Sequence, residues 1–82
     1  MRTAPKEGGE QMTIAESNGV VPGNIERLIT DSGFKKGYVA EKAGLSSGIL
    51  SDMLNNRRLI RVADIVAISN ALGIEINELL KE

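Results

Sequence analysis

Apolar residues recur at the three- and four-residue spacing of a helix on both sides of a glycine near the middle of the chain. The apolar positions before Gly44 are Val39, Ala40 and Ala43, and those after it are Leu50, Met53 and Leu54. Because glycine readily adopts the left-handed conformation of a tight turn, the pattern predicts two short helices, 36–43 and 47–54, that cross steeply.

The same spacing predicts three further helices around this pair. The first begins after its N-cap Asn24 and ends at Gly33, and the fourth ends at Gly73. The expected buried faces are Ile25, Leu28 and Ile29 in the first helix and Val62, Ile65, Val66, Ile68 and Leu72 in the fourth. Phe34 is expected to fold back onto the first helix and to join the core.

A short last helix is predicted from the apolar residues Ile74, Ile76, Leu79 and Leu80. So small a segment cannot bury this much apolar surface alone. The last helix is therefore expected either to pack across the first and fourth helices or to meet a second copy of the chain.

Residues 1–23 show no helical or strand period and are rich in Gly, Glu and Thr, so a disordered tail is predicted before one domain at 24–82. Within this tail, the residues from Glu7 to Met12 can be encoded by a string that contains a bacterial ribosome-binding sequence before an ATG codon. We therefore hypothesise that Met12 is the natural start and that residues 1–11 are not native.

Composition narrows the chemistry of this domain. The 82 residues include no cysteine and no histidine, which removes disulfides, thiolate chemistry, the usual general base and the commonest metal ligand. Serine hydroxyls have no histidine to activate them, so no catalytic, cofactor or metal site is predicted. No segment has the length of a membrane span or the pattern of a signal peptide, and the expected location is the cytoplasm.

The paired central helices have the arrangement of a helix-turn-helix. The positions that identify the type of helix-turn-helix are Ala40, Gly44, Leu45 and Leu50, followed later by Ala71-Leu72-Gly73-Ile74. With this spacing the chain resembles, over residues 24–80, the phage Cro and repressor type of DNA-binding domain, also called the xenobiotic-response-element class. The resemblance implies an all-α, compact five-helix domain like that of lambda repressor.

The resemblance also implies which residues read DNA sequence, because in this family the N-terminal part of the second motif helix enters the major groove. Carried over position by position, the base-reading residues are Ser47, Gly48, Ile49, Ser51 and Asp52. A serine hydroxyl serves several bases, an isoleucine can touch a thymine methyl, and an aspartate can accept from a cytosine amino group. None makes the bidentate contacts of Arg, Gln or Asn, so DNA shape or a partner subunit is expected to add specificity.

Phosphate contacts are expected on both sides of this helix. The residues concerned are Lys35, Lys36, Ser46, Asn55, Arg57 and Arg58. The two lysines stand at a helix start, where backbone N–H groups favour a phosphate. Ser46 is the expected N-cap, and Asn56 is expected to take a left-handed conformation where the family prefers glycine. The alternatives are a solvated lysine pair and two arginines that pair with surface carboxylates.

The charge of the chain leaves two function classes open. A net charge of −1 is unusual for a nucleic-acid binder, but residues 24–66 carry seven basic and five acidic side chains, and both tails are acidic. The favoured interpretation is a sequence-specific regulator of transcription, a repressor of phage or mobile-element type, that binds double-stranded DNA as a homodimer. The alternative is a protein-interaction module such as an antitoxin or adaptor, which Gly48, Asp52 and the low charge favour.

Overall fold

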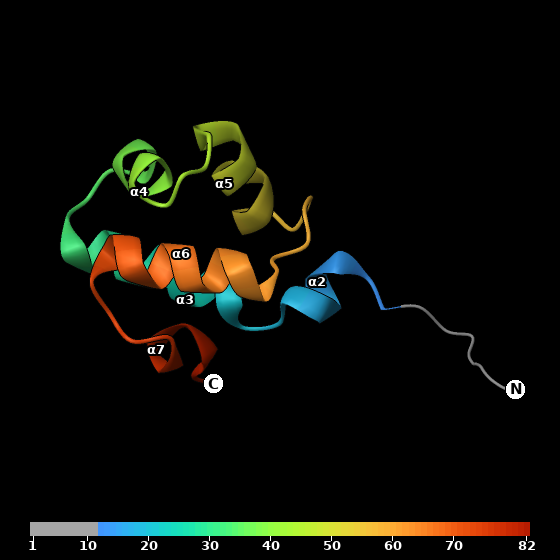
Figure 1. Cartoon of the computed structure of the whole chain (residues 1–82). Coiled ribbons are helices and arrows are strands. Elements are labelled where there is room, and N and C mark those ends of the chain that lie inside the picture. Colours follow the sequence, from blue (N-terminus) through green and yellow to red (C-terminus); the bar gives the residue numbers. More distant parts are fainter. Residues whose placement is uncertain (1–11) are drawn as a thin grey trace, which may run out of the picture.

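The computed structural model describes residues 12–82, which form six helices and no strand. The helices are α2 (Ile14–Asn18), α3 (Val21–Ser32), α4 (Lys36–Lys42), α5 (Ser47–Leu54), α6 (Val62–Leu72) and α7 (Asn77–Leu80). In Figure 1, α4 and α5 lie at one end of the molecule, α3 and α6 lie in the middle, and α7 lies at the opposite end. The all-helical prediction is confirmed, and none of the described helices is long and apolar enough to cross a membrane.

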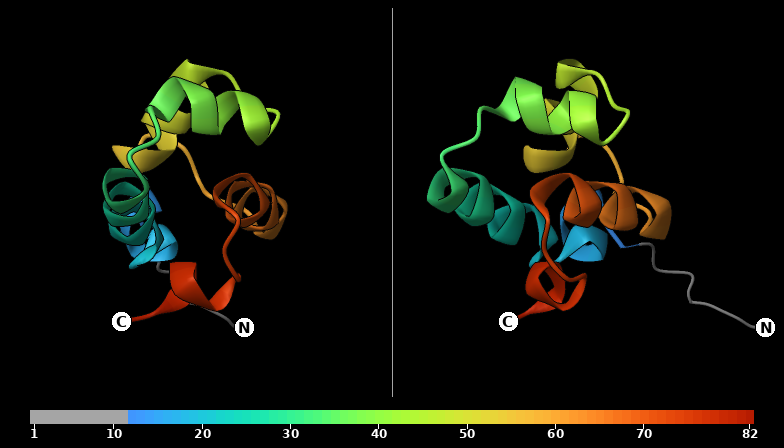
Figure 2. Two further views of the ribbon diagram at one scale, coloured as in Figure 1. Left: turned by 90° about the vertical axis from the view of Figure 1, so that its left-hand side faces the viewer. Right: turned by 60° about the vertical axis from the view of Figure 1, so that its left-hand side comes forward.

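The core is aliphatic and lies between α3 and α6, with α4 and α5 on one side and α7 on the other (Figure 2). Its buried members are Val21, Ile25, Ile29, Val39, Ala40, Leu50, Met53, Leu54, Ile60, Ile68, Leu72 and Leu79. The prediction for α6 is partly wrong, because Val62 is 76% exposed and Val66 is also exposed. These two valines are one turn apart, and helical geometry places them about a third of the way around α6 from Ile68 and Leu72.

Helices α3 and α6 end as predicted. Gly33 and Gly73 adopt left-handed conformations with φ of 80° and 69°, and the N–H of each donates back into the last turn of its helix. At the start of α6, the Asp64 carboxylate accepts the Arg61 N–H at 2.9 Å, which supplies a cap that the arginine side chain cannot.

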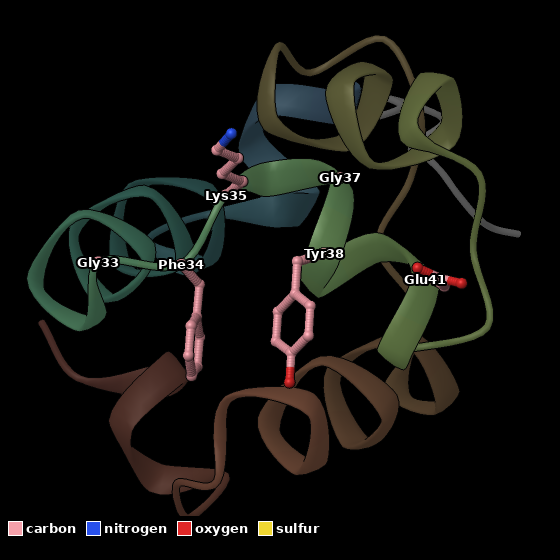
Figure 3. Close-up of a pocket in the computed structure, with 6 residues that line it drawn as sticks. All are labelled: Gly33, Phe34, Lys35, Gly37, Tyr38 and Glu41. Atoms are coloured by element: carbon pink, nitrogen blue, oxygen red, sulfur yellow. The ribbon is translucent and has the colours of Figure 1, made fainter.

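The prediction that Phe34 belongs to the core is wrong, because its side chain is 40% exposed. Instead of folding onto Ile29, the ring lies against Tyr38 with 5.0 Å between ring centroids. Figure 3 shows the two rings side by side and Lys35 extending away from them. An open hollow of ≈ 620 Å³ borders the rings, lined by Gly33, Phe34, Lys35, Gly37, Tyr38 and Glu41.

The prediction of no regular structure before Asn24 is wrong for the described residues, because α2 and the first turn of α3 lie there. Helix α2 begins with a reciprocal capping pair, in which Glu16 N–H donates to Thr13 Oγ1 at 3.1 Å and Thr13 N–H donates to Glu16 Oε1 at 2.8 Å. Pro22 lies in the first turn of α3, where its missing N–H costs nothing. The hypothesis about residues 1–11 lies outside the described residues.

Asn24 is not an N-cap but an interior residue of α3 that holds α7 in place. Its Nδ2 donates to the carbonyl oxygens of Leu79 at 2.9 Å and Lys81 at 2.8 Å. Helix α7 packs against α3 and α6, as one of the two predicted arrangements requires. Leu79 is fully buried there, whereas Ile76 and Leu80 remain exposed.

Candidate nucleic-acid interface

The turn between α4 and α5 is held by backbone hydrogen bonds that reach back into α4. Gly44 has a φ of 76°, its N–H donates to Glu41 O at 3.0 Å, and Leu45 N–H donates to Ala40 O at 2.8 Å. Leu45 packs against the core, and Ala40 is buried where α4 and α5 meet. The predicted break at Gly44 is confirmed, and it directs the chain into a second, separately oriented helix.

Helix α5 presents a small polar face because its apolar side is fixed in the core. Leu50, Met53 and Leu54 are buried. Ser46 Oγ accepts the Ile49 N–H at 3.1 Å, which confirms the predicted N-cap. The five predicted base-reading residues all lie on this helix, where Ser47, Gly48 and Ser51 are exposed and Ile49 and Asp52 are half-buried.

The start of α4 lies beside the start of α5. A Cβ built on Gly37 would lie 3.5 Å from Ser47 Oγ, so Lys35 and Lys36 stand next to the N-terminal end of the polar face. No side chain caps α4 at Lys35. Lys36 Nζ lies 3.1 Å from Glu26 Oε2 in an exposed ion pair, and such pairs contribute about 0–1 kcal/mol, so a phosphate can compete for this lysine.

Gly37 provides a stability test of this helix start. Gly37→Ala should raise the free energy of unfolding by about 0.5–1 kcal/mol and the melting temperature by about 2–8 °C, because alanine favours the helix. The added Cβ meets Ser47 Oγ at an ordinary contact distance of 3.5 Å. Thermal unfolding followed by circular dichroism measures the change. Gly44→Ala is the matched control and should destabilise the chain, because the φ of +76° strains any L side chain.

The loop after α5 brings the predicted basic residues to the other end of the polar face. Asn56 has a φ of 59°, which confirms its predicted left-handed conformation. Arg57 N–H donates to Asp52 O at 2.7 Å, and Arg57 Nε lies 3.2 Å from Asp52 Oδ1. Asn55 Nδ2 donates to Ser51 O at 2.8 Å. The loop therefore turns back along the last turn of α5.

One polar residue of this region was missed by the sequence prediction. Asn18, the last residue of α2, is buried with 3% exposure and hydrogen-bonds to the loop after α5. The Thr13 and Glu16 capping pattern was the available signal for α2, but no local pattern reveals a contact with residues about forty positions later. Within residues 12–82, no cluster of three or more carboxylates is arranged to hold a metal ion.

Comparisons with solved structures show that this fold recurs in bacterial proteins. The restriction-modification controller protein C.AhdI from Aeromonas hydrophila is 22% identical, with a TM-score of 0.72 over 78% of this chain and 97% of its own. The clp gene regulator ClgR from C. glutamicum is 20% identical, with a TM-score of 0.73 over 87% of each chain. The hypothetical transcription factor NHTF from Neisseria is 22% identical, with a TM-score of 0.73 over 88% of this chain and 83% of its own.

A comparison with curated proteins finds no match. The family model described as Helix-turn-helix, of the Cro/C1 type, matches residues 25–79. This match covers α4, α5, α6 and the turns between them, together with the last two thirds of α3 and most of α7. The chain therefore belongs to the Cro/C1-type helix-turn-helix family.

Proposed function

We propose that this chain is a transcriptional regulator that binds double-stranded DNA in a sequence-specific manner, with α5 in the major groove. The observation that carries the proposal is the polar face of α5, which has basic side chains at both ends. Lys35 and Lys36 stand beside its first turn, and Arg57 and Arg58 follow its last turn. A major groove about 12 Å wide admits one helix, and the flanking cations would then face the two phosphate backbones.

In this proposal the first turns of α5 read the bases. Ser47 and Ser51 offer hydroxyls that donate or accept, and Ile49 offers a methyl contact for thymine. Gly48 is exposed and carries no side chain, so the backbone of α5 can approach the base edges closely. Asp52 accepts from a cytosine amino group, and its ion pair with Arg57 reduces its repulsion of nearby phosphates.

The phosphate contacts hold the helix in register without reading sequence. Lys35, Lys36, Arg57 and Arg58 supply positive charge. Ser46 already accepts a hydrogen bond from Ile49 N–H, but its hydroxyl proton still can be donated to a phosphate oxygen. Asn55 Nδ2 donates one proton to Ser51 O at 2.8 Å, and its contact with Ser51 Oγ is long at 3.4 Å. Its second proton can therefore be donated to a phosphate oxygen.

We assign two copies of the chain to each DNA site. One α5 with a few weak base contacts gives little affinity, and two copies double the contacts over successive turns of the groove. The exposed Ile76, directly before α7, and Leu80 on α7 offer apolar surface for such an assembly. The finer assignment, a repressor of phage or mobile-element type, is supported by the Cro/C1 type of the family.

A salt titration tests the proposal. Fluorescence polarisation with a duplex selected from a random pool should show affinity that falls steeply with salt, with a log–log slope of about −0.9 for each phosphate contact. Sedimentation of the same complex should show two chains per duplex. Binding that is absent, or that does not change between 50 and 200 mM salt, would contradict the proposal.

A failed titration would favour the second candidate, a protein-interaction module of the antitoxin or adaptor kind. The observation that keeps this candidate is the pairing of two of the cations with carboxylates, Lys36 with Glu26 and Arg57 with Asp52. A module of this kind would use the polar face of α5 against a protein, and its weak DNA binding would lack sequence preference.

A further inference from the structure

The side chain of Asn18 connects α2 to the loop between α5 and α6. Asn18 is buried with 3% exposure, although it lies outside the stretch 25–79 that the family model matches. The loop that it contacts, residues 55–61, carries Arg57 and Arg58. A polar group that is buried so completely must have hydrogen-bond partners, because leaving it unpaired costs free energy.

The carboxamide of Asn18 meets three groups of this loop. Its Nδ2 donates to Arg58 O at 3.1 Å and to Asn56 Oδ1 at 3.2 Å, and its Oδ1 accepts the Ile60 N–H at 2.8 Å. These partners fix the orientation of the amide. If the amide were turned by 180°, its oxygen would face the Arg58 carbonyl oxygen and its NH₂ would face the Ile60 N–H, so neither hydrogen bond could form.

Two features make this contact specific to the basic part of the loop. The bonds to Arg58 O and Ile60 N–H hold the backbone on both sides of Leu59, directly after the two arginines. The bond to Asn56 Oδ1 holds the side chain of the one non-glycine residue with positive φ among residues 12–82. The bond to Asn56 Oδ1 therefore supports a left-handed backbone conformation, which costs free energy for most residues.

We propose that Asn18 is a positioning residue that fixes the Arg57–Arg58 backbone before DNA binds. This inference rests on the proposed function and extends it to a helix outside the family match. A loop that is already ordered loses less conformational entropy when its arginines contact phosphates, so binding is tighter. Helix α2 is itself held at its start by the Thr13 and Glu16 capping pair.

The test compares Asn18→Ala with Ser17→Ala, which changes the exposed neighbouring residue of α2. Amide hydrogen exchange of the full chain without DNA should become faster at Ile60, whose N–H donates to Asn18 Oδ1, in Asn18→Ala, with α5 unchanged. Affinity for a 20-base-pair duplex of random sequence at low salt should fall about three- to tenfold, as expected for loss of one or two ordered side chains. Ser17→Ala should change neither quantity. Circular dichroism confirms that each variant is folded at the temperature used.

A double-mutant cycle separates positioning from a general loss of structure. In a chain that already carries Arg57→Ala and Arg58→Ala, Asn18→Ala should have no further effect on affinity, because the groups it positions are gone. An equal loss in both backgrounds, or unchanged affinity in Asn18→Ala, would overturn the inference while the unmodified chain still binds. If the unmodified chain shows no salt-dependent binding, the proposed function itself fails, and the role of Asn18 in DNA binding fails with it.

Discussion

Replacing Arg57 and Arg58 together with alanine is expected to weaken binding to every duplex about 10- to 100-fold at 0.1 M salt. Each arginine that contacts a phosphate releases close to one counterion, so the log–log salt slope should also become shallower by about 2. Sequence preference should remain, because neither side chain reaches a base in the proposed complex. Polarisation titrations against the selected duplex and a scrambled one measure both quantities.

The matched control removes two positive charges elsewhere. Arg27→Ala with Lys81→Ala changes the net charge by the same amount, and both residues lie in exposed ion pairs on α3 and after α7. This variant should lose little affinity. On the scrambled duplex, where Asp52 reads no base, Asp52→Asn should act in the opposite direction and strengthen binding, because it removes a carboxylate beside the phosphates. Equal losses in the two charge-matched variants would show that Arg57 and Arg58 do not contact DNA.

Replacing Leu50 with alanine is expected to lower the free energy of unfolding by about 2–5 kcal/mol, the range for leucine truncation in a core. Leu50 is 1% exposed and holds α5 against the buried face of the domain. Small domains have about 5–15 kcal/mol of stability in total, so this loss is a large fraction of it, and the denaturant concentration at the unfolding midpoint should fall accordingly. Chemical denaturation followed by circular dichroism measures the loss.

Leu59→Ala makes the same chemical change at a side chain that is 41% exposed. Its cost should stay within about 1 kcal/mol, since less apolar surface returns to water. If the two substitutions cost the same, α5 is not anchored through Leu50, and the description of its buried face is wrong.

The turns of this fold could be predicted because the signal for each turn is local. Gly33, Gly44 and Gly73 end helices with positive φ, as their positions after apolar periodic segments indicate. Asn56 also has a positive φ, in the loop after α5, because asparagine tolerates that conformation better than most residues. The N-cap at Ser46 is equally local, since its partner is Ile49 N–H three residues later.

The contacts of Asn18 and Asn24 could not be predicted, because each depends on groups far along the chain. Asn24 precedes an apolar stripe, and asparagine is a residue type favoured at N-caps. Its side chain nevertheless donates to carbonyl groups 55 and 57 residues later. The predictions that Phe34 and Val62 are buried were wrong for another reason. Periodicity shows that a position is apolar, but whether a neighbour covers it depends on where the adjacent helices end.

For the candidate site, the positions of the residues could be predicted from the sequence, but their ion pairs could not. The resemblance implied which residues contact DNA, and in the structure these residues lie on α5 and on the segments that flank it. The pairing of Asp52 with Arg57 and of Lys36 with Glu26 required coordinates, because neither pair follows from helical spacing. Both pairs lower the net positive charge that DNA would meet.

The hydrogen bonds from Asn24 to the Leu79 and Lys81 carbonyls fix the C-terminal end of α7 against α3. In Figure 1 this end of the chain lies opposite α4 and α5. A fluorophore or fusion partner joined after Glu82 would consequently be carried on the far side of the molecule. Such a label can report tumbling of a protein–DNA complex without obstructing the groove-facing helix.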